Sequence, residues 1–152
     1  MHEFAIALGF GAVVSLGLAA GALLAEAGVL VPYWRAQEPG DFLAGYARHA
    51  PMLLRFFGPL EVASGGLVVA ATVLAWLGFL PGRAPLTAAS ALTLAVLLCF
   101  PLYFQRANAS FASGSIALEQ VAAELARWSR WHRLRTGLAI AAFALSLAAF
   151  VG

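Results

Sequence analysis

The side chains of this sequence that can move a proton or stabilise a charge lie at the ends of its long apolar segments. The set consists of Glu26, Glu61, Asn108, His132 and Arg135. A histidine or a carboxylate can act as a general base, and an arginine and an amide can stabilise a developing oxyanion. These residue types therefore favour acid–base catalysis, with His132 or a carboxylate as the base and with Arg135 and Asn108 holding negative charge.

The same residue types leave metal or haem chemistry open as an alternative. A zinc ion takes three or four protein ligands, and a haem needs an axial histidine. The candidate ligands are His132, His49, Glu26 and Glu61, which form one set only if the segment that carries His49 folds inward. A ferritin-like di-iron site is disfavoured because no glutamate has a histidine three residues further along the chain. Cys99 is the only cysteine, which excludes an intrachain disulfide and a cysteine metal cluster.

The composition requires that these side chains be positioned inside a membrane. Of the 152 residues, 62% are hydrophobic and 11% are charged, whereas a soluble domain has roughly 45–50% apolar and about 25% charged residues. One membrane-spanning helix needs about 20 apolar residues, so the chain is long enough for four spans. A soluble enzyme is excluded. A nucleic-acid-binding protein is excluded too, because the nine arginines adjoin apolar segments and form no polar basic face.

The uncharged stretches predict a single domain, residues 1–152, with an all-α fold that is a transmembrane four-helix bundle. The predicted spans cover about residues 4–31, 52–80, 84–106 and 127–151. The first span is expected to be retained, because it is too long for a signal-peptide core and no Lys or Arg precedes it. We also expect short interfacial helices on the cytoplasmic side. One runs over 41–49 and is ended by Pro51, and one over 116–135 continues into the last span.

The arginines predict how the bundle is oriented. Eight of the nine lie between the uncharged stretches 4–25 and 62–80 or between 84–105 and 136–152, and only Arg83 lies on the other side. Positively charged residues are enriched in cytoplasmic loops. We therefore expect both long connections to be cytoplasmic and both termini outside, in a bacterial inner membrane whose lipids surround the protein.

Helical spacing places the polar side chains on packing faces. In the last helix Trp128, His132 and Arg135 share one stripe, which continues through small residues as close packing in lipid prefers. A stripe of small residues in the first span ends at Glu26, and Glu61 opens a similar stripe in the second span. Because ionisable groups in spans usually face partners or a cavity, these side chains are predicted to converge at the cytoplasmic end.

Structural explanations of the same residues stay open beside the chemical one. Glu26 and Glu61 can simply pair with Arg135 and Arg55 and thereby pin the helices, and His132 can be a hydrogen-bonded packing residue. The aromatic residues fit an interfacial belt or, alternatively, the wall of a cavity for a flat ligand. They are Tyr33, Trp34, Trp128 and Trp131.

Several segments resemble the anthrone-oxygenase-like family of small four-span membrane proteins. The similar segments are residues 26–32 (EAGVLVP), 56–61 (FFGPLE), 103–108 and, as the most specific, 128–136 (WSRWHRLRT). The resemblance covers nearly the whole chain. It implies oxidation of an anthrone to an anthraquinone by molecular oxygen with no required cofactor.

The resemblance also implies roles for individual residues. His132 would remove the proton, Arg135 and Asn108 would hold the oxyanion, and Trp128, Trp131 and Tyr103 would pack on the flat rings. We therefore expect an oxygenase for a lipophilic aromatic, anthrone- or quinol-like substrate. The alternatives are a metal- or haem-binding redox protein and a non-catalytic membrane subunit. A homo-oligomer is also possible, because small residues of the first span can pack against a second copy.

Overall fold

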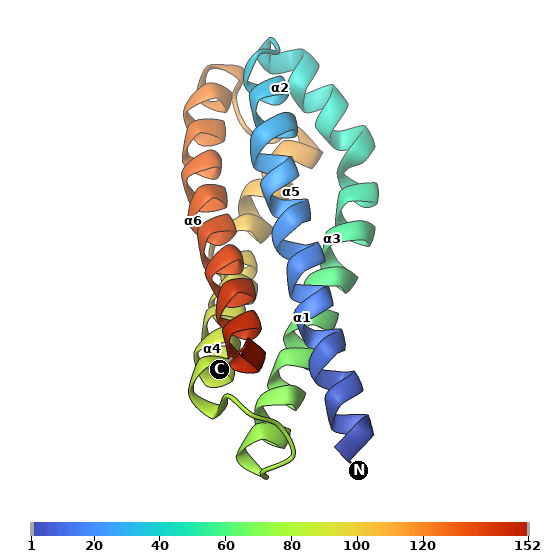
Figure 1. Ribbon diagram of the computed structural model, residues 1–152. Coiled ribbons are helices and arrows are strands. Elements are labelled where there is room, and N and C mark those ends of the chain that lie inside the picture. The colour runs from blue at the N-terminus through green and yellow to red at the C-terminus, as the bar shows by residue number, and fades with distance from the viewer. Residues whose placement is uncertain (1, 152) are drawn as a thin grey trace.

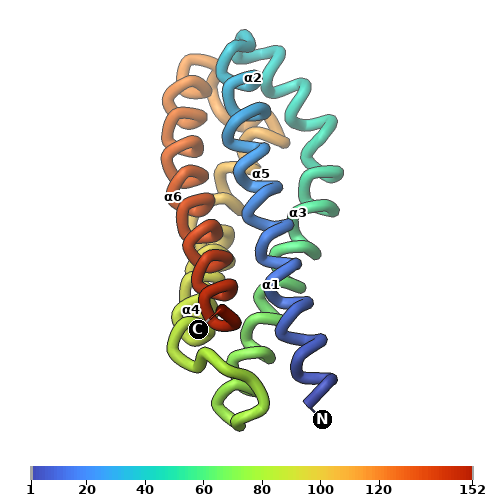
Figure 2. The backbone as a smooth tube through the Cα atoms, viewed as in Figure 1, coloured from blue at the N-terminus to red at the C-terminus, as the bar shows by residue number. Residues whose placement is uncertain are grey.

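The computed structural model, which describes residues 2–151, is a bundle of four long helical rods (Figure 1). In chain order the rods are α1 (His2–Ala25), η1 (Glu26–Leu30) and α2 (Val31–Arg35); α3 (Pro39–Trp76); α4 (Arg83–Cys99), η2 (Phe100–Phe104) and α5 (Gln105–Ser113); and α6 (Leu118–Val151). The backbone trace in Figure 2 shows that short turns join them, so that successive rods run in opposite directions. The predicted all-α four-helix bundle is confirmed.

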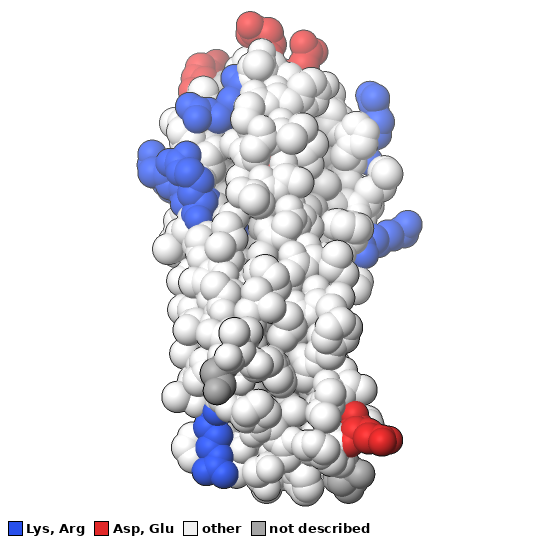
Figure 3. Space-filling view, viewed as in Figure 1, with Lys and Arg blue, Asp and Glu red and all other residues white. Residues whose placement is uncertain are grey.

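Each rod contains a stretch that is long and apolar enough to cross a membrane. Only 28–33% of the residues in each of these stretches are buried inside the bundle. The visible surface has a broad uncharged band, and most charged side chains gather toward the α2 end (Figure 3). Helices whose backbone bonds are all internal and whose outer surface is apolar are suited to lipid. The chain is therefore an integral membrane protein.

The first of the two expected interfacial helices is not a separate element. The segment over 41–49 is the beginning of α3, which continues through Pro51 and Pro59 to Trp76. The prediction that Pro51 ends a helix was wrong. A proline removes one backbone hydrogen bond, but in a membrane the neighbouring helices can hold both sides of the kink together. The other expected helix, over 116–135, was predicted to continue into the last span, and α6 does run unbroken from Leu118 to Val151.

The half of the bundle that carries the chain termini, here called the small-residue half, is packed mainly by short side chains. Its buried core consists of Ala5, Ala12, Leu16, Val68, Ala71, Ala75, Leu80, Leu86, Ala89 and Ala149. The hydroxyl oxygens of Thr72 and Ser90 lie 2.7 Å apart across α3 and α4. Side chains of this size allow helix backbones to approach closely, which is how helices associate in lipid.

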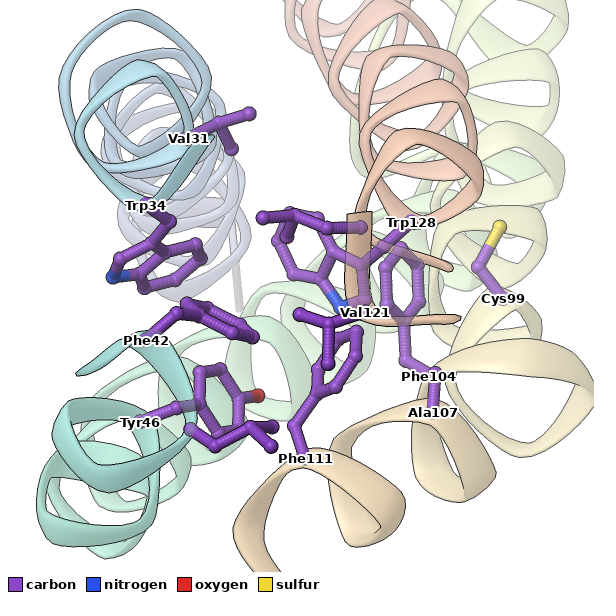
Figure 4. Packing of buried hydrophobic residues seen from close by; sticks show 12 residues of the cluster. Val31, Trp34, Phe42, Tyr46, Cys99, Phe104, Ala107, Phe111, Val121 and Trp128 are labelled. Carbon is purple, nitrogen blue, oxygen red and sulfur yellow. The ribbon is translucent and has the colours of Figure 1, made fainter. Parts of the chain in front are cut away.

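The opposite half, here called the aromatic half, is packed by large rings (Figure 4). Its core contains Trp34, Phe42, Tyr46, Phe104, Phe111 and Trp128. Most of these rings meet edge to face, as in the pair Trp34 and Trp128, whose centroids are 5.6 Å apart at 79°. Rings of this size hold helices further apart than alanines do, and the candidate site lies in this half.

Candidate functional site

Two π-helical segments shape the rods next to the site. In η1 the Val31 N–H bonds to the Glu26 carbonyl, and after η2 the Gln105 N–H bonds to the Phe100 carbonyl. A proline lies beside or within each segment, Pro32 after η1 and Pro101 in η2. Because a proline has no N–H and crowds the carbonyl four residues earlier, the helix widens by one residue there. Glu26 begins the first wide turn and is buried.

A guanidinium from α6 joins two carboxylates from two other rods. Arg135 Nη2 lies 3.4 Å from Glu26 Oε2, and Arg135 Nη1 lies 3.4 Å from Glu61 Oε1. All three residues are buried. The guanidinium carbon also lies 4.4 Å from the centroid of the Phe104 ring, within the range of a cation–π interaction. The structure thus brings together polar side chains that the spacing predicted to converge.

His132 is held in one neutral form by its hydrogen bonds. Its Nε2 lies 3.0 Å from the Leu23 carbonyl oxygen, which can only accept, so Nε2 carries the hydrogen. Nδ1 must then accept, and Arg135 Nη2 donates to it over 3.2 Å. The ring is 1% exposed and stacks on Trp128, with centroids 4.9 Å apart. His132 therefore fixes Arg135 to the backbone of α1.

A cavity of about 710 Å³ lies beside the carboxylates. Small-molecule pockets typically measure roughly 300–1,000 Å³ and are mostly apolar with a few polar groups. The polar residues of this cavity's wall are Glu26, Tyr46, Glu61, Gln105, Asn108 and Arg135. The rest of the wall is apolar and includes Phe57, Phe100 and Trp128. The cavity therefore has the size and the polarity of a site for a lipophilic molecule.

Asn108 presents a hydrogen-bond donor to this cavity. The Trp128 indole Nε1 donates to Asn108 Oδ1 over 2.8 Å. Because the amide oxygen is used in this way, its NH₂ group remains to donate to a molecule in the cavity. The orientation of the amide follows from this bond to the indole, which has a donor and no acceptor.

Two buried polar atoms near the cavity have no hydrogen-bond partner among residues 2–151. They are Glu61 Oε1 and Arg135 Nε. Buried polar atoms in proteins are nearly always hydrogen-bonded, but here Glu61 Oε1 has only its 3.4 Å ion-pair contact with Arg135 Nη1. The formal charges of Glu26, Glu61 and Arg135 do not cancel. With both carboxylates ionised and His132 neutral the cluster carries −1, and it becomes neutral when one carboxylate takes up a proton.

Among the aromatic residues expected to bind a substrate, Tyr33, Tyr103 and Trp131 lie outside the cavity wall. Trp131 stacks on Tyr103, with ring centroids 5.2 Å apart and an interplanar angle of 6°. The Tyr103 hydroxyl donates to Glu124 Oε1 over 2.8 Å. Tyr33 is 61% exposed on the outside of α2. Trp128 is the one member of the expected group that lines the cavity.

The candidate metal ligands are not assembled into one set. Within residues 2–151, no group of three or more His, Cys, Asp or Glu side chains is arranged to hold a metal ion. His132 Nδ1 and Glu26 Oε2 lie 3.6 Å apart. His49 is exposed, and its ring donates to the Gly45 carbonyl over 2.7 Å. Arg55 is also exposed, so the pairing of a buried carboxylate with Arg55 is replaced by the shared pairing with Arg135.

Part of the cavity wall was missed because α3 was expected to begin after Pro51. The wall residues of α3 are Tyr46, Ala50, Pro51, Leu53, Leu54, Phe57, Gly58, Glu61 and Val62. Their spacing is that of one face of a continuous helix which leads to Glu61. This signal was present in the sequence. It was not recognised because part of this helix face was assigned to a predicted interfacial helix and the rest to a predicted span.

Comparison of the chain with protein-family models, with curated proteins and with solved structures finds no match.

Proposed function

We propose that this protein is an oxygenase that binds a lipophilic aromatic substrate in the cavity and removes a proton from it with Glu61. The observation that carries this proposal is that buried Glu61 lines a largely apolar cavity and that its one ion pair among the described residues is with Arg135, over 3.4 Å. A carboxylate in that position accepts a hydrogen bond or a proton from a ligand. The resemblance of segments 26–32, 56–61 and 128–136 to anthrone oxygenases points to the same class of substrate.

The proposed reaction converts a ring CH₂ group opposite a carbonyl into a second carbonyl. Glu61 takes one proton from the CH₂ carbon, and the electron pair that remains spreads onto the carbonyl oxygen. The Asn108 amide donates to that oxygen and stabilises its charge. Molecular oxygen then accepts the electrons and bonds to the carbon, and the peroxide that forms takes the proton back from Glu61. The resulting hydroperoxide loses its remaining C–H hydrogen and its outer OH as water, which leaves the carbonyl. In total, CH₂ and O₂ become C=O and H₂O.

In this mechanism His132 and Arg135 are positioning residues. His132 is absent from the cavity wall and already uses both ring nitrogens, so we assign the base to Glu61 instead of His132. Arg135 holds Glu61 and Glu26 in place and offsets part of their charge. A His132→Gln variant is expected to keep part of its activity, whereas a variant without the base is not.

The test is oxygen uptake with anthrone by the protein in lipid nanodiscs, measured above the rate of empty nanodiscs. Glu61→Gln keeps the shape of the side chain and removes the base, so we expect turnover to fall by about 10²–10⁴-fold. The matched control is Glu124→Gln, on α6, where the carboxylate bonds to Tyr103 away from the cavity. Its turnover should stay within about twofold of the parent. Unchanged turnover in Glu61→Gln, or no turnover in the parent protein, would contradict the proposal.

One observation favours a second candidate function, a non-catalytic membrane subunit that binds a lipophilic ligand. Arg135 contacts both carboxylates at once, which is also what a purely structural pin between rods would need. This candidate predicts that the ligand binds without oxygen uptake. It also predicts that Glu61→Gln changes the stability of the protein and leaves no activity to be lost.

We further propose that the end of the bundle with α2 and α5 faces the cytoplasm of a bacterial inner membrane. Eight of the nine arginines lie on this side of the uncharged stretches of the four rods. A reporter that fluoresces only in the cytoplasm, inserted in the turn at Gln37, should be bright. A dark reporter there would reverse the orientation.

A further inference from the structure

The second and third rods touch at two levels and separate between them. Near the α2 end, the ring of Phe111 on α5 meets Phe42 and Tyr46 on α3 at centroid distances of 5.1 and 5.5 Å. Toward the small-residue half, a Cβ added at Gly65 would lie 2.8 Å from Leu97 Cδ1. Between these contacts, both rods line the cavity and do not close over it. At Gly58 an added Cβ would meet only Leu54, a residue of the same helix, within 4 Å.

The cavity wall reaches the outer surface of the bundle in this gap. Leu54 and Val62 of α3 line the cavity and are 59% and 65% exposed. On the facing rod Gln105 and Ala109 also line it and are exposed. Glu61 lies between Leu54 and Val62 in the sequence, but its side chain is buried. The cavity thus has an apolar mouth on the side of the bundle and a polar floor at its centre.

The mouth extends from the level of the exposed Arg55 and Arg106 toward the middle of the bundle at Val62. Arg55 is exposed on α3 beside the mouth, and such arginines reach toward lipid headgroups. Val62 follows Arg55 by seven residues, which is about 10 Å further along the helix axis. The outer surface next to the mouth is apolar, with Phe56, Leu98 and Leu102 all exposed.

We propose that the substrate enters this cavity sideways from the membrane, through the opening between α3 and the η2–α5 segment. The identity of the substrate rests on the function proposed above, but the route does not. The occupant is an amphipathic aromatic molecule dissolved in the lipid. Its polar ring system reaches Glu61 and Asn108, and its apolar substituents lie against Leu54, Val62 and the adjacent lipid chains.

The first experiment measures whether lipid or water reaches the inner wall of the cavity, and it needs no substrate. Leu53, a partly buried residue of that wall, is changed to cysteine in a Cys99→Ala background and labelled with a nitroxide. In lipid bilayers we expect collisions with oxygen to exceed collisions with a water-soluble nickel chelate. Labels at Gly66→Cys and Ser115→Cys serve as the lipid and water references, because both positions are exposed. More collisions with the nickel chelate, or protection from both reagents, would overturn the proposal.

The second experiment narrows the mouth. Gly58→Trp places an indole in the opening, whereas Gly66→Trp, two turns along the same helix, points to open space outside the cavity. With 2-hydroxyanthraquinone as the probe, followed by quenching of tryptophan fluorescence in nanodiscs, we expect Gly58→Trp to slow association at least about tenfold relative to Gly66→Trp. Equal rates would overturn the lateral route. A mouth open to lipid in a protein that does not oxidise anthrone would overturn only the proposed function.

Discussion

The small-residue half and the aromatic half of this bundle satisfy their buried polar groups in different ways. In the small-residue half the hydroxyl of Thr93 bonds to the Ala89 carbonyl of its own helix. Thr72 bonds to the Val68 carbonyl of its own helix and also reaches the Leu86 carbonyl and the Ser90 hydroxyl of α4. In the aromatic half, Glu26, Glu61 and Arg135 come from three different rods and depend on one another. A hydroxyl has an acceptor on its own helix whether or not a neighbouring helix adds another, whereas the buried charges need partners on other helices and therefore hold a site together.

The two halves also differ in how much space they leave. Alanines and glycines let the rods meet in one half, and large rings and wide π-helical turns separate them in the other. The cavity therefore lies where the side chains are largest. Ligand pockets are often found between the helices of bundles, and here buried charged residues form part of the wall.

The largest expected effect comes from breaking the ion pairs of the aromatic half. Arg135→Gln leaves two carboxylates buried without their cation, so the free energy of unfolding should fall by about 3–5 kcal/mol. Adding Glu26→Gln to this variant should restore part of the loss, because it removes one of the stranded charges. Thermal unfolding in mild detergent measures both. An Arg135→Gln protein as stable as the parent would show that the pairs contribute nothing.

The next effect comes from the small-residue half, at the turn before α4. Gly82 has φ 72°, and a Cβ there would lie 2.6 Å from the Ala149 backbone. Gly82→Ala should therefore cost about 1–2 kcal/mol for the left-handed backbone and about 1–3 kcal/mol for the overlap. Gly78→Ala is the control, because its φ is 86° but nothing lies within 4 Å. If both variants unfold at the same temperature, close packing against Ala149 does not determine the stability of this half.

A smaller effect is expected at the wall of the cavity. Trp128→Phe keeps a ring in place but removes the donor to Asn108 Oδ1, so the amide loses its fixed orientation. One lost hydrogen bond is worth roughly 1 kcal/mol, which corresponds to about fivefold weaker binding of 2-hydroxyanthraquinone. Trp131→Phe, which lies outside the cavity, should bind the probe as the parent does. Equal weakening in the two variants would contradict the role given to Asn108.

The smallest effect should come at the border between the halves. Gly65→Ala brings a methyl group against the end of the Leu97 side chain, which can shift, so a loss of about 1 kcal/mol is expected. Gly66→Ala faces open space and should be within about 0.5 kcal/mol of the parent. Chemical or thermal unfolding of the two variants side by side measures the difference. A greater loss of stability in Gly66→Ala than in Gly65→Ala would mean that another protein surface covers the side of α3 that carries Gly66.

The sequence by itself determined the four spans and the end of the bundle at which Glu26, Glu61, Asn108, His132 and Arg135 gather. The lengths of the uncharged runs and the spacing of three and four residues are enough for this, because a helix in lipid must be apolar outside and turns at a constant rate. The meeting of Arg135 with Glu26 could be predicted in the same way, since each residue lies on the packing stripe of its helix.

Only the tertiary structure decided how each of these residues is used. Pro51 does not end a helix, because contacts on both sides hold α3 together, and the face that leads from Tyr46 to Glu61 is therefore continuous. His132 and Trp131 are neighbours in the chain, and each lies three or four residues from Trp128 and from Arg135. The His132 ring nevertheless bonds to the Leu23 carbonyl, whereas the Trp131 ring stacks on Tyr103 outside the cavity. These outcomes depend on the rotation of each rod about its axis, which the π-helical turns change locally. The spacing of residues along one helix cannot predict that rotation, because the packing between the rods sets it.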